Sequence, residues 1–259
     1  MLHDKSYERH LPHQVPVGFP IFLTWNLRGS LPQQVIEKLS FEAERLERSP
    51  LRPNENDRDR KIRHAKVLFV KRDQSLDASY QKYVSLSRLT GAKLTGVAEQ
   101  VSLERLTYDG RPMWLADPAA ACEVVKSILW GIPVRYLLWS FVVMGNHVHC
   151  LLTPLVELAV ITQGIKGFTS YKINKLQNSP GRVVWQDESF DHWARDEEEF
   201  HRIIEYIENN PVVAALCDQT HDWKSSSAFV RTAYQWKRDE PFPVGKKDEA
   251  VKLFESLLG

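Results

Sequence analysis

Apolar side chains fall into short continuous runs and into helical repeats along the chain, and the two patterns predict different elements. Residues 20–27 and 135–143 are runs rich in aromatic, leucine and β-branched side chains, which predicts strands. Residues 119–130 and 156–176 repeat apolar side chains every three or four positions, which predicts helices. Asp117, followed by a proline, is a suitable N-cap for the first of these helices. The pattern therefore predicts a mixed α+β chain.

Residues 141–152 consist of two apolar runs separated by a turn at Gly145 and Asn146, which predicts a β-hairpin. The second run contains His147 and His149. Side chains two positions apart on a strand project from the same face. Two imidazoles side by side on a rigid sheet are half of a metal site. Polar residues on a solvated strand face would give the same pattern, so both interpretations stay open at this point.

The stretches around these elements predict the remaining helices and strands. A helix is predicted from residue 31 to 46, and a charge-dense surface loop or insertion from 49 to 63. A short strand is predicted at 183–186, and the helix that begins at the acidic residues 196–199 is predicted to end at Pro211. We therefore expect a ferredoxin-like βαββαβ antiparallel sheet with helices on one face and a helical or loop insertion after the first strand.

Composition narrows the class of protein. The 259 residues are 43% hydrophobic and 26% charged, as is ordinary for a soluble globular protein. The net charge of +1 argues against a grossly basic protein, although a local basic groove remains possible. Three widely separated cysteines indicate a reducing compartment, and no apolar run reaches signal-peptide or membrane-spanning character. We expect a cytoplasmic protein that contacts no membrane.

The helix after residue 196 carries Tyr206 and Asn210, which are four positions apart and share one helical face. Taken alone, a tyrosine in this position is also typical of the rim of a hydrophobic core. Residues 144–149 (Met-Gly-Asn-His-Val-His) and 206–212 (Tyr-Ile-Glu-Asn-Asn-Pro-Val) together resemble the REP-associated tyrosine transposases. These belong to the HUH single-strand endonucleases and are related to the IS200/IS605-type single-tyrosine transposases.

Further segments follow the order of that family, and they are residues 22–25, 31–32, 114–118, 185–186, 190–192, 195–198 and 222–226. The resemblance covers about residues 20–230, apart from part of 40–110. It departs from the family at Gly145, where the family usually has proline, and either residue suits a turn. It implies one catalytic domain at 19–235 with an insertion at about 40–112, preceded by an irregular arm at 1–18. A C-terminal tail with a short helix is expected at 236–259.

The resemblance also implies a chemistry. His147, His149 and Asn210 would bind Mg²⁺ or Mn²⁺, and Tyr206 would attack phosphorus to give a 5′-phosphotyrosine link and a free 3′-hydroxyl. The implied activity is that of a metal-dependent endonuclease and strand transferase acting on single-stranded or hairpin DNA from palindromic repeats, with a monomer favoured over a dimer. The candidate contacts to the DNA backbone are Lys166, Lys172, Lys175, Arg182 and Arg195.

Alternatives remain for both the nucleophile and the function. Tyr171 lies among lysines on the preceding helix and is a competing nucleophile, but Tyr206 is preferred because only it has an amide four positions later. The protein could instead be a catalytically inactive hairpin-binding protein. A zinc-dependent hydrolase would need a third strong ligand and a base besides His147 and His149. His192 and His201 lie nearest in sequence to the predicted site helix, and His192 is better interpreted as a packing or DNA-contact residue.

Overall fold

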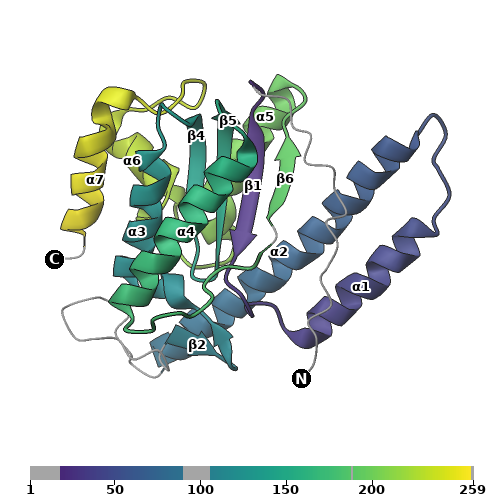
Figure 1. Cartoon of the computed structure of the whole chain (residues 1–259), viewed down its shortest axis with the longest axis horizontal. Helices are drawn as coiled ribbons and strands as arrows, with labels where there is room; N and C mark the ends of the chain where they lie inside the picture. Colours follow the sequence, from purple (N-terminus) through teal and green to yellow (C-terminus); the bar gives the residue numbers. More distant parts are fainter. Residues whose placement is uncertain (1–17, 90–105, 188, 258–259) are drawn as a thin grey trace.

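The computed structural model describes residues 18–89, 106–187 and 189–257, and these build a four-stranded antiparallel sheet with helices on both sides (Figure 1). The strands are β1 (Ile21–Asn26), β4 (Tyr136–Val143), β5 (His147–Pro154) and β6 (Phe190–Trp193), in the spatial order β4-β5-β1-β6. The predicted βαββαβ order and the antiparallel α+β class are confirmed. The arm predicted for residues 1–18 lies, apart from Gly18, outside the described residues.

One face of the sheet packs against the two crossover helices, α3 (Pro118–Trp130) and α4 (Leu158–Leu176). As predicted, Asp117 caps α3, and its carboxylate accepts from the Ala119 N–H at 3.0 Å. Alternate residues of the strands, such as Trp25 and Val148, enter this apolar core. The C-terminal helix α7 (Lys247–Ser256) packs on α3 and adds Phe254 to the same core.

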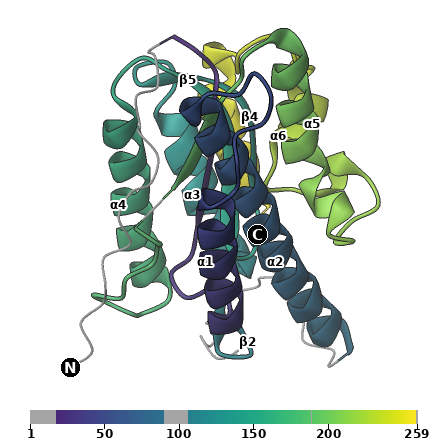
Figure 2. The same ribbon diagram turned by 90° about the vertical axis from the view of Figure 1, so that its right-hand side faces the viewer.

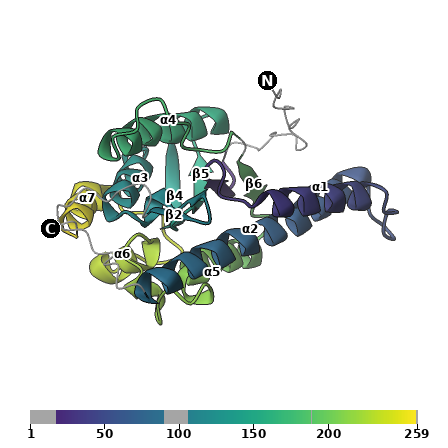
Figure 3. The same cartoon turned by 90° about the horizontal axis from the view of Figure 1, so that it is seen from below.

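The opposite face is also covered, by α5 (Glu197–Val213) and by the long helix α2 (Asp57–Leu89), which run side by side (Figure 3). Helix α1 (Gln33–Glu47) forms a helical hairpin with α2, and the tip of this hairpin extends beyond the sheet (Figures 1 and 2). Helices were expected on one face only, and α3 and α4 fit that expectation. The second face is covered as well, in part by α2, which belongs to the inserted segment between β1 and α3. The segment also contains a small β2 (Thr107–Tyr108) and β3 (Arg111–Pro112) pair.

The structure corrects three local predictions. Residues 57–63, predicted as a loop, form the start of α2, because their charges pair along the helix, as Arg60 does with Asp57 at 2.9 Å. Residues 183–186 make only an isolated bridge, between Trp185 and Leu27, and the fourth strand is β6 instead. Helix α5 continues past Pro211 to Val213, since the Ala214 N–H donates to the Asn210 carbonyl beyond the proline.

The remaining elements are short and follow α5 or precede α3. They are the helix α6 (Ser227–Tyr234) and the 3-10 turns η2 (Trp114–Ala116), η3 (Thr220–Asp222) and η4 (Val244–Lys246). Among the helices in the described ranges, none combines the length and the apolar character needed to cross a lipid bilayer.

Candidate metal and nucleophile site

The two histidines predicted to share a face lie on β5, an inner strand that pairs with β4 on one side and β1 on the other. His147 and His149 both point toward α2 and α5, and their ring centroids are 4.8 Å apart. Neither ring is exposed to solvent. The interpretation of a solvated strand face is therefore wrong, and a buried polar pair calls for partners or for a ligand.

The hydrogen bonds on the far side of each ring direct the near nitrogen into the site. Asn146 Oδ1 lies 2.7 Å from His147 Nδ1, and the Asn146 amide nitrogen donates to the Leu76 carbonyl at 3.0 Å, which fixes the orientation of that amide. An amide oxygen only accepts, so His147 Nδ1 carries the proton and Nε2 keeps its lone pair. Thr24 Oγ1 lies 2.7 Å from His149 Nδ1 and orients that ring, but a hydroxyl both donates and accepts, so the contact does not assign the ring proton.

Two carboxylates from the inserted helix face these histidines. Asp73 Oδ1 lies 3.3 Å from His149 Nε2 and 3.9 Å from His147 Nε2, and Asp77 Oδ1 lies 3.5 Å from His147 Nε2. Asp73 is almost fully buried. Ligand atoms of Asp73, His147 and His149 all fall within 4.8 Å of one another, a group that could hold a metal ion. The sequence interpretation missed both aspartates, although their i, i+4 spacing places them on one face of a helix.

The ionisable side chains of this group shift the pKa values of one another. Burial, with the neighbouring His149 ring, lowers the pKa of His147 to about 3, so this imidazole is neutral at neutral pH. Burial and then the charge of Asp73 raise the pKa of Asp77 to about 8. At neutral pH the Asp77 carboxyl therefore keeps its proton, whereas the neighbouring His149 holds the pKa of Asp73 below its usual value against the effect of burial.

Tyr206 comes from α5 and reaches the same group. Its hydroxyl donates a hydrogen bond to Asp73 Oδ2, and its ring centroid lies 5.6 Å from that of His149. Phe22 and Phe69 contact the tyrosine ring edge-on, which holds it beside the sheet. Tyr206 is 39% exposed, so it connects the buried group to solvent.

Asn210 lies one turn further along α5 and is 3% exposed. Its side chain hydrogen-bonds the Asp77 carboxyl, and its Oδ1 has no hydrogen-bond partner within the described part of the chain. The predicted ligand therefore reaches the histidine pair through Asp77.

Behind Tyr206, the buried Glu208 fixes the rotation of α5. Two residues along a helix turn the side chain about 200°, so Glu208 points away from the site. Its carboxylate accepts from Ser227 Oγ at 2.8 Å and lies 3.0 Å from Arg238 Nη2, and it also binds Arg231. Arg231 in turn donates to the Trp139 carbonyl of β4.

The turn before His147 explains the departure at Gly145. A Cβ added at Gly145 would collide with the ring of Tyr80, which projects from α2. Tyr80 is almost fully buried there and contacts Trp223 and Tyr83. A glycine at this position therefore lets α2 lie directly against the histidine hairpin.

The five basic residues predicted to contact DNA do not gather around Tyr206. Lys166 donates to the carbonyls of Gln186 and Asp187, and Arg182 stacks on Trp114 at 3.7 Å. Lys172 approaches Glu123 of α3 at 3.7 Å. Lys175 is exposed near the end of α4, and Arg195 is exposed just before α5. Tyr171, the competing nucleophile, is 63% exposed on α4, in the layer on the other side of the sheet (Figure 3).

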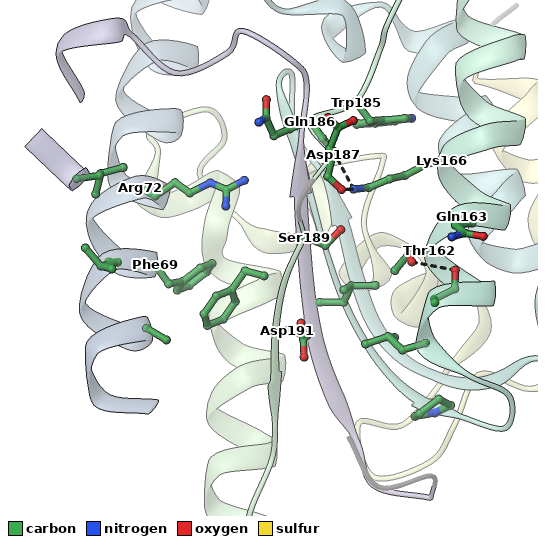
Figure 4. Close-up of a pocket in the computed structure, with 18 of the residues that line it drawn as sticks. Phe69, Arg72, Thr162, Gln163, Lys166, Trp185, Gln186, Asp187, Ser189 and Asp191 are labelled. Carbon is green, nitrogen blue, oxygen red and sulfur yellow. Dashed lines mark hydrogen bonds between the residues drawn. The ribbon is translucent and has the colours of Figure 1, made fainter. Parts of the chain in front are cut away.

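A groove of about 1240 Å³ lies between the α1–α2 hairpin and α4 (Figure 4). Figure 4 shows Phe69 and Arg72 of α2 on one side of the groove and Lys166 with Thr162 of α4 on the other. Phe69 also contacts the Tyr206 and His149 rings, so the groove begins beside the buried group. Its charged lining is mixed, with basic Arg60, Lys61, Arg72, Lys166 and Arg182 and acidic Glu47, Glu157, Asp187 and Asp191.

The two histidines weighed for a zinc site lie elsewhere. His192 Nε2 is 2.9 Å from Glu199 Oε1, and this carboxylate also binds Lys66 of α2 at 2.7 Å. This network ties α2 to α5 and β6, in accord with a packing role for His192. His201 is exposed on α5 and lies 3.8 Å from Glu197.

Five buried side-chain atoms around the histidine pair fit a divalent cation. Across the described ranges they have no hydrogen-bond partner, and they are His147 Nε2, His149 Nε2, Asp73 Oδ1, Asp77 Oδ1 and Asn210 Oδ1. Imidazole nitrogens with carboxylate and amide oxygens suit Mn²⁺, Mg²⁺ or Zn²⁺.

Two comparisons find known proteins that this chain resembles. Residues 132–210 match the family described as IS200-like transposases, a segment that runs from β4 to Asn210 and leaves out α2. Over this segment the resemblance to the single-tyrosine transposases is confirmed. A solved structure of a REP-associated tyrosine transposase bound to a REP hairpin is 15% identical, with a TM-score of 0.41, and each chain is covered to 93%. Among curated proteins none matches the chain.

Proposed function

We propose that the protein is a metal-dependent endonuclease and strand transferase that acts on hairpin DNA in single-stranded form, with Tyr206 as its nucleophile. The observation that carries the proposal is the meeting of Tyr206 with His147 and His149 on one sheet face, within the segment that matches the IS200-like transposases. Hairpin DNA as the substrate class rests on the resemblance of residues 144–149 and 206–212 to the REP-associated tyrosine transposases.

Each residue of the site has a distinct role in the proposed reaction. Tyr206 Oη attacks the scissile phosphorus, the new O–P bond forms, and the bond from phosphorus to the 3′ oxygen breaks. The departing 3′ oxygen takes a proton from water and leaves as a free 3′-hydroxyl, and the 5′ phosphate stays on the tyrosine. The hydrogen bond from Tyr206 to Asp73 gives the phenol proton an acceptor. Mg²⁺ or Mn²⁺ held by His147, His149 and Asn210 would polarise the phosphate and balance its developing charge.

Positive charges away from the buried group position the strand. Arg195 and Lys175 are exposed and suit backbone phosphate contacts. Lys166 lines the groove beside Phe69 and carries a charge toward its interior (Figure 4). Lys172 and Arg182 are engaged with neighbouring side chains, so we assign them a smaller share of the DNA contacts.

A zinc-dependent hydrolase remains the second candidate, because Asp73 supplies the third strong ligand that the sequence did not offer. A hydrolase would release product without attaching DNA to the protein. The formation of a covalent adduct therefore separates the two functions.

The test is incubation with end-labelled hairpin oligonucleotides from the palindromic repeats of the source genome, with Mn²⁺, followed by a denaturing gel. We expect a covalent adduct with the unaltered protein and none with Tyr206→Phe. Tyr171→Phe is the matched control and should form the adduct normally. An adduct that persists in Tyr206→Phe, or a phosphotyrosine mapped to the peptide around Tyr171, would show that the nucleophile is assigned to the wrong residue.

A further inference from the structure

The inserted helix α2 reaches the centre of the candidate site, and the IS200-like match does not include it. Asp73 and Asp77 lie one turn apart on α2 and place their Oδ1 atoms 3.3 to 3.9 Å from the histidine Nε2 atoms. No well-aligned hydrogen bond joins these four atoms among the described residues.

The hydrogen bond to the His147 ring shows which of its nitrogens faces the two aspartates. Asn146 accepts at His147 Nδ1, so the lone pair of His147 Nε2 faces the oxygens of Asp73 and Asp77. A cation between the lone pair of His147 Nε2 and these oxygens would make each contact favourable. A dication would also balance the two carboxylates, whereas an amide in their place would leave the ion uncompensated.

We propose that Asp73 and Asp77 of α2 are ligands of the same cation as His147 and His149, so that the inserted helix completes the metal site. This inference rests on the proposed function, whose metal site it extends. Asp73 then has two roles: its Oδ1 faces the cation position, and its Oδ2 accepts the hydrogen bond that positions Tyr206. Besides its own amide oxygen, Asn210 supports the site through its hydrogen bond to Asp77.

Three contacts hold α2 in the position that places these carboxylates. Lys66 binds Glu199 of α5, the Leu76 carbonyl accepts from Asn146, and Tyr80 fills the space left by Gly145. These three contacts span α2 on both sides of Asp73 and Asp77. The helix is therefore fixed against α5 and the histidine hairpin at the positions that set the geometry of the two aspartates.

The test measures Mn²⁺ binding to the full chain without DNA, by titration calorimetry and by the electron paramagnetic resonance signal of free Mn²⁺. Loss of a ligand should weaken the affinity for Mn²⁺ at least about tenfold, so we expect this for Asp73→Ala and for Asp77→Ala. Asp59→Ala is the matched control, because Asp59 lies exposed on the same helix, and it should bind Mn²⁺ as the unaltered protein does. Asn210→Ala should lose less affinity than Asp73→Ala.

Thermal unfolding in a chelator checks that the variants fold. Asp73→Ala loses the hydrogen bond from Tyr206, so the metal-free variant should still unfold cooperatively but at a somewhat lower temperature, and added Mn²⁺ should stabilise it less than the unaltered protein. Asp73→Asn keeps the shape and should show an intermediate Mn²⁺ affinity.

Two results would overturn the assignment of α2. One is Mn²⁺ affinity unchanged in both aspartate variants, above all if adduct formation becomes faster, which would make α2 a cover over the site. The other is a loss confined to Asn210→Ala. The proposed function is tested separately. If the unaltered protein forms no adduct, while Asp73→Ala still loses Mn²⁺ affinity, the nuclease assignment is refuted and the ligand assignment stands.

Discussion

The two faces of the sheet are buried alike but differ in what they bury. On β5, Val148 and Leu152 enter the apolar core under α3 and α4, while His147 and His149 enter the space under α2 and α5. All four side chains are inaccessible to solvent. Moving the apolar side chains out of water stabilises the fold, whereas burying the histidine nitrogens destabilises it unless something binds them. The comparison shows that unpartnered buried polar atoms, more than burial itself, distinguish the functional face of this fold.

The largest effect expected is on stability, from paired substitutions on opposite faces of β5. Leu152→Ala should lower the free energy of unfolding by about 2–5 kcal/mol, because it leaves a cavity in a packed core. His149→Ala should cost less, since only one of its two ring nitrogens has a hydrogen-bond partner among the described residues, yet it should abolish adduct formation. Urea unfolding and the hairpin assay measure the two quantities. Equal destabilisation by both changes would contradict the division of roles between the faces.

The next effect concerns the contact between α2 and the histidine hairpin. Gly145→Ala places a methyl group in the Tyr80 ring and should cost about 1–3 kcal/mol through overpacking. Gly167→Ala on α4 is the control, because a Cβ there meets no atom within 4 Å and alanine favours the helix by up to about 1 kcal/mol. If α2 sets the site, Gly145→Ala should also weaken Mn²⁺ binding. A neutral result at Gly145 would mean that Tyr80 moves aside freely.

A smaller effect should appear in the dependence of stability on pH. The pKa of Glu199 is lowered to about 2, because hydrogen bonds from Lys66, His192 and the Arg195 N–H together outweigh the effect of burial. A carboxylate with a lowered folded-state pKa stabilises the protein above its unfolded pKa, and this stabilisation fades as pH falls from about 4.5 toward 2. Glu199→Gln should therefore lose roughly 1 kcal/mol at neutral pH and show a shallower decline over this acid range. A decline with the same slope in both proteins would place the acid sensitivity elsewhere.

The smallest effect expected is the contribution of a single basic side chain to DNA affinity. Each phosphate contact contributes about 0.7 to the log–log slope of affinity against salt for single strands. Lys175→Ala and Arg195→Ala should each reduce the slope by up to that amount, while Lys172→Ala should change it less because Lys172 faces Glu123. Fluorescence anisotropy with a hairpin oligonucleotide at several salt concentrations measures the slope. A larger change for Lys172 than for Lys175 would reverse this ranking.

The sequence predicted the elements whose pattern is local. The run that forms β5, the capped start of α3 at Asp117 and the shared face of His147 and His149 all follow from neighbours within a few residues. The end of α5 at Pro211 was predicted wrongly, because a proline removes one hydrogen bond but the helix can resume beyond it.

What the sequence could not provide was the placement of α2. Its polar composition hides a helix that is buried along only one side, and the run from 57 to 63 was interpreted as a loop for that reason. Asp73 lies more than 70 residues before His147 and more than 130 before Tyr206, so no short motif links them. The spacing of Asp73 and Asp77 was visible, but its meaning depends on which way the helix docks.

The ion pair behind Tyr206 bears on how the protein resists force. A DNA strand attached to Tyr206 would pull on α5 whenever the rest of the DNA moves or is displaced. Glu208 joins the back of α5 to α6 and Arg238, and through Arg231 to the main chain of β4. In the proposed reaction these contacts would carry tension from Tyr206 to the sheet, beside the direct hydrogen bond from Tyr206 to Asp73.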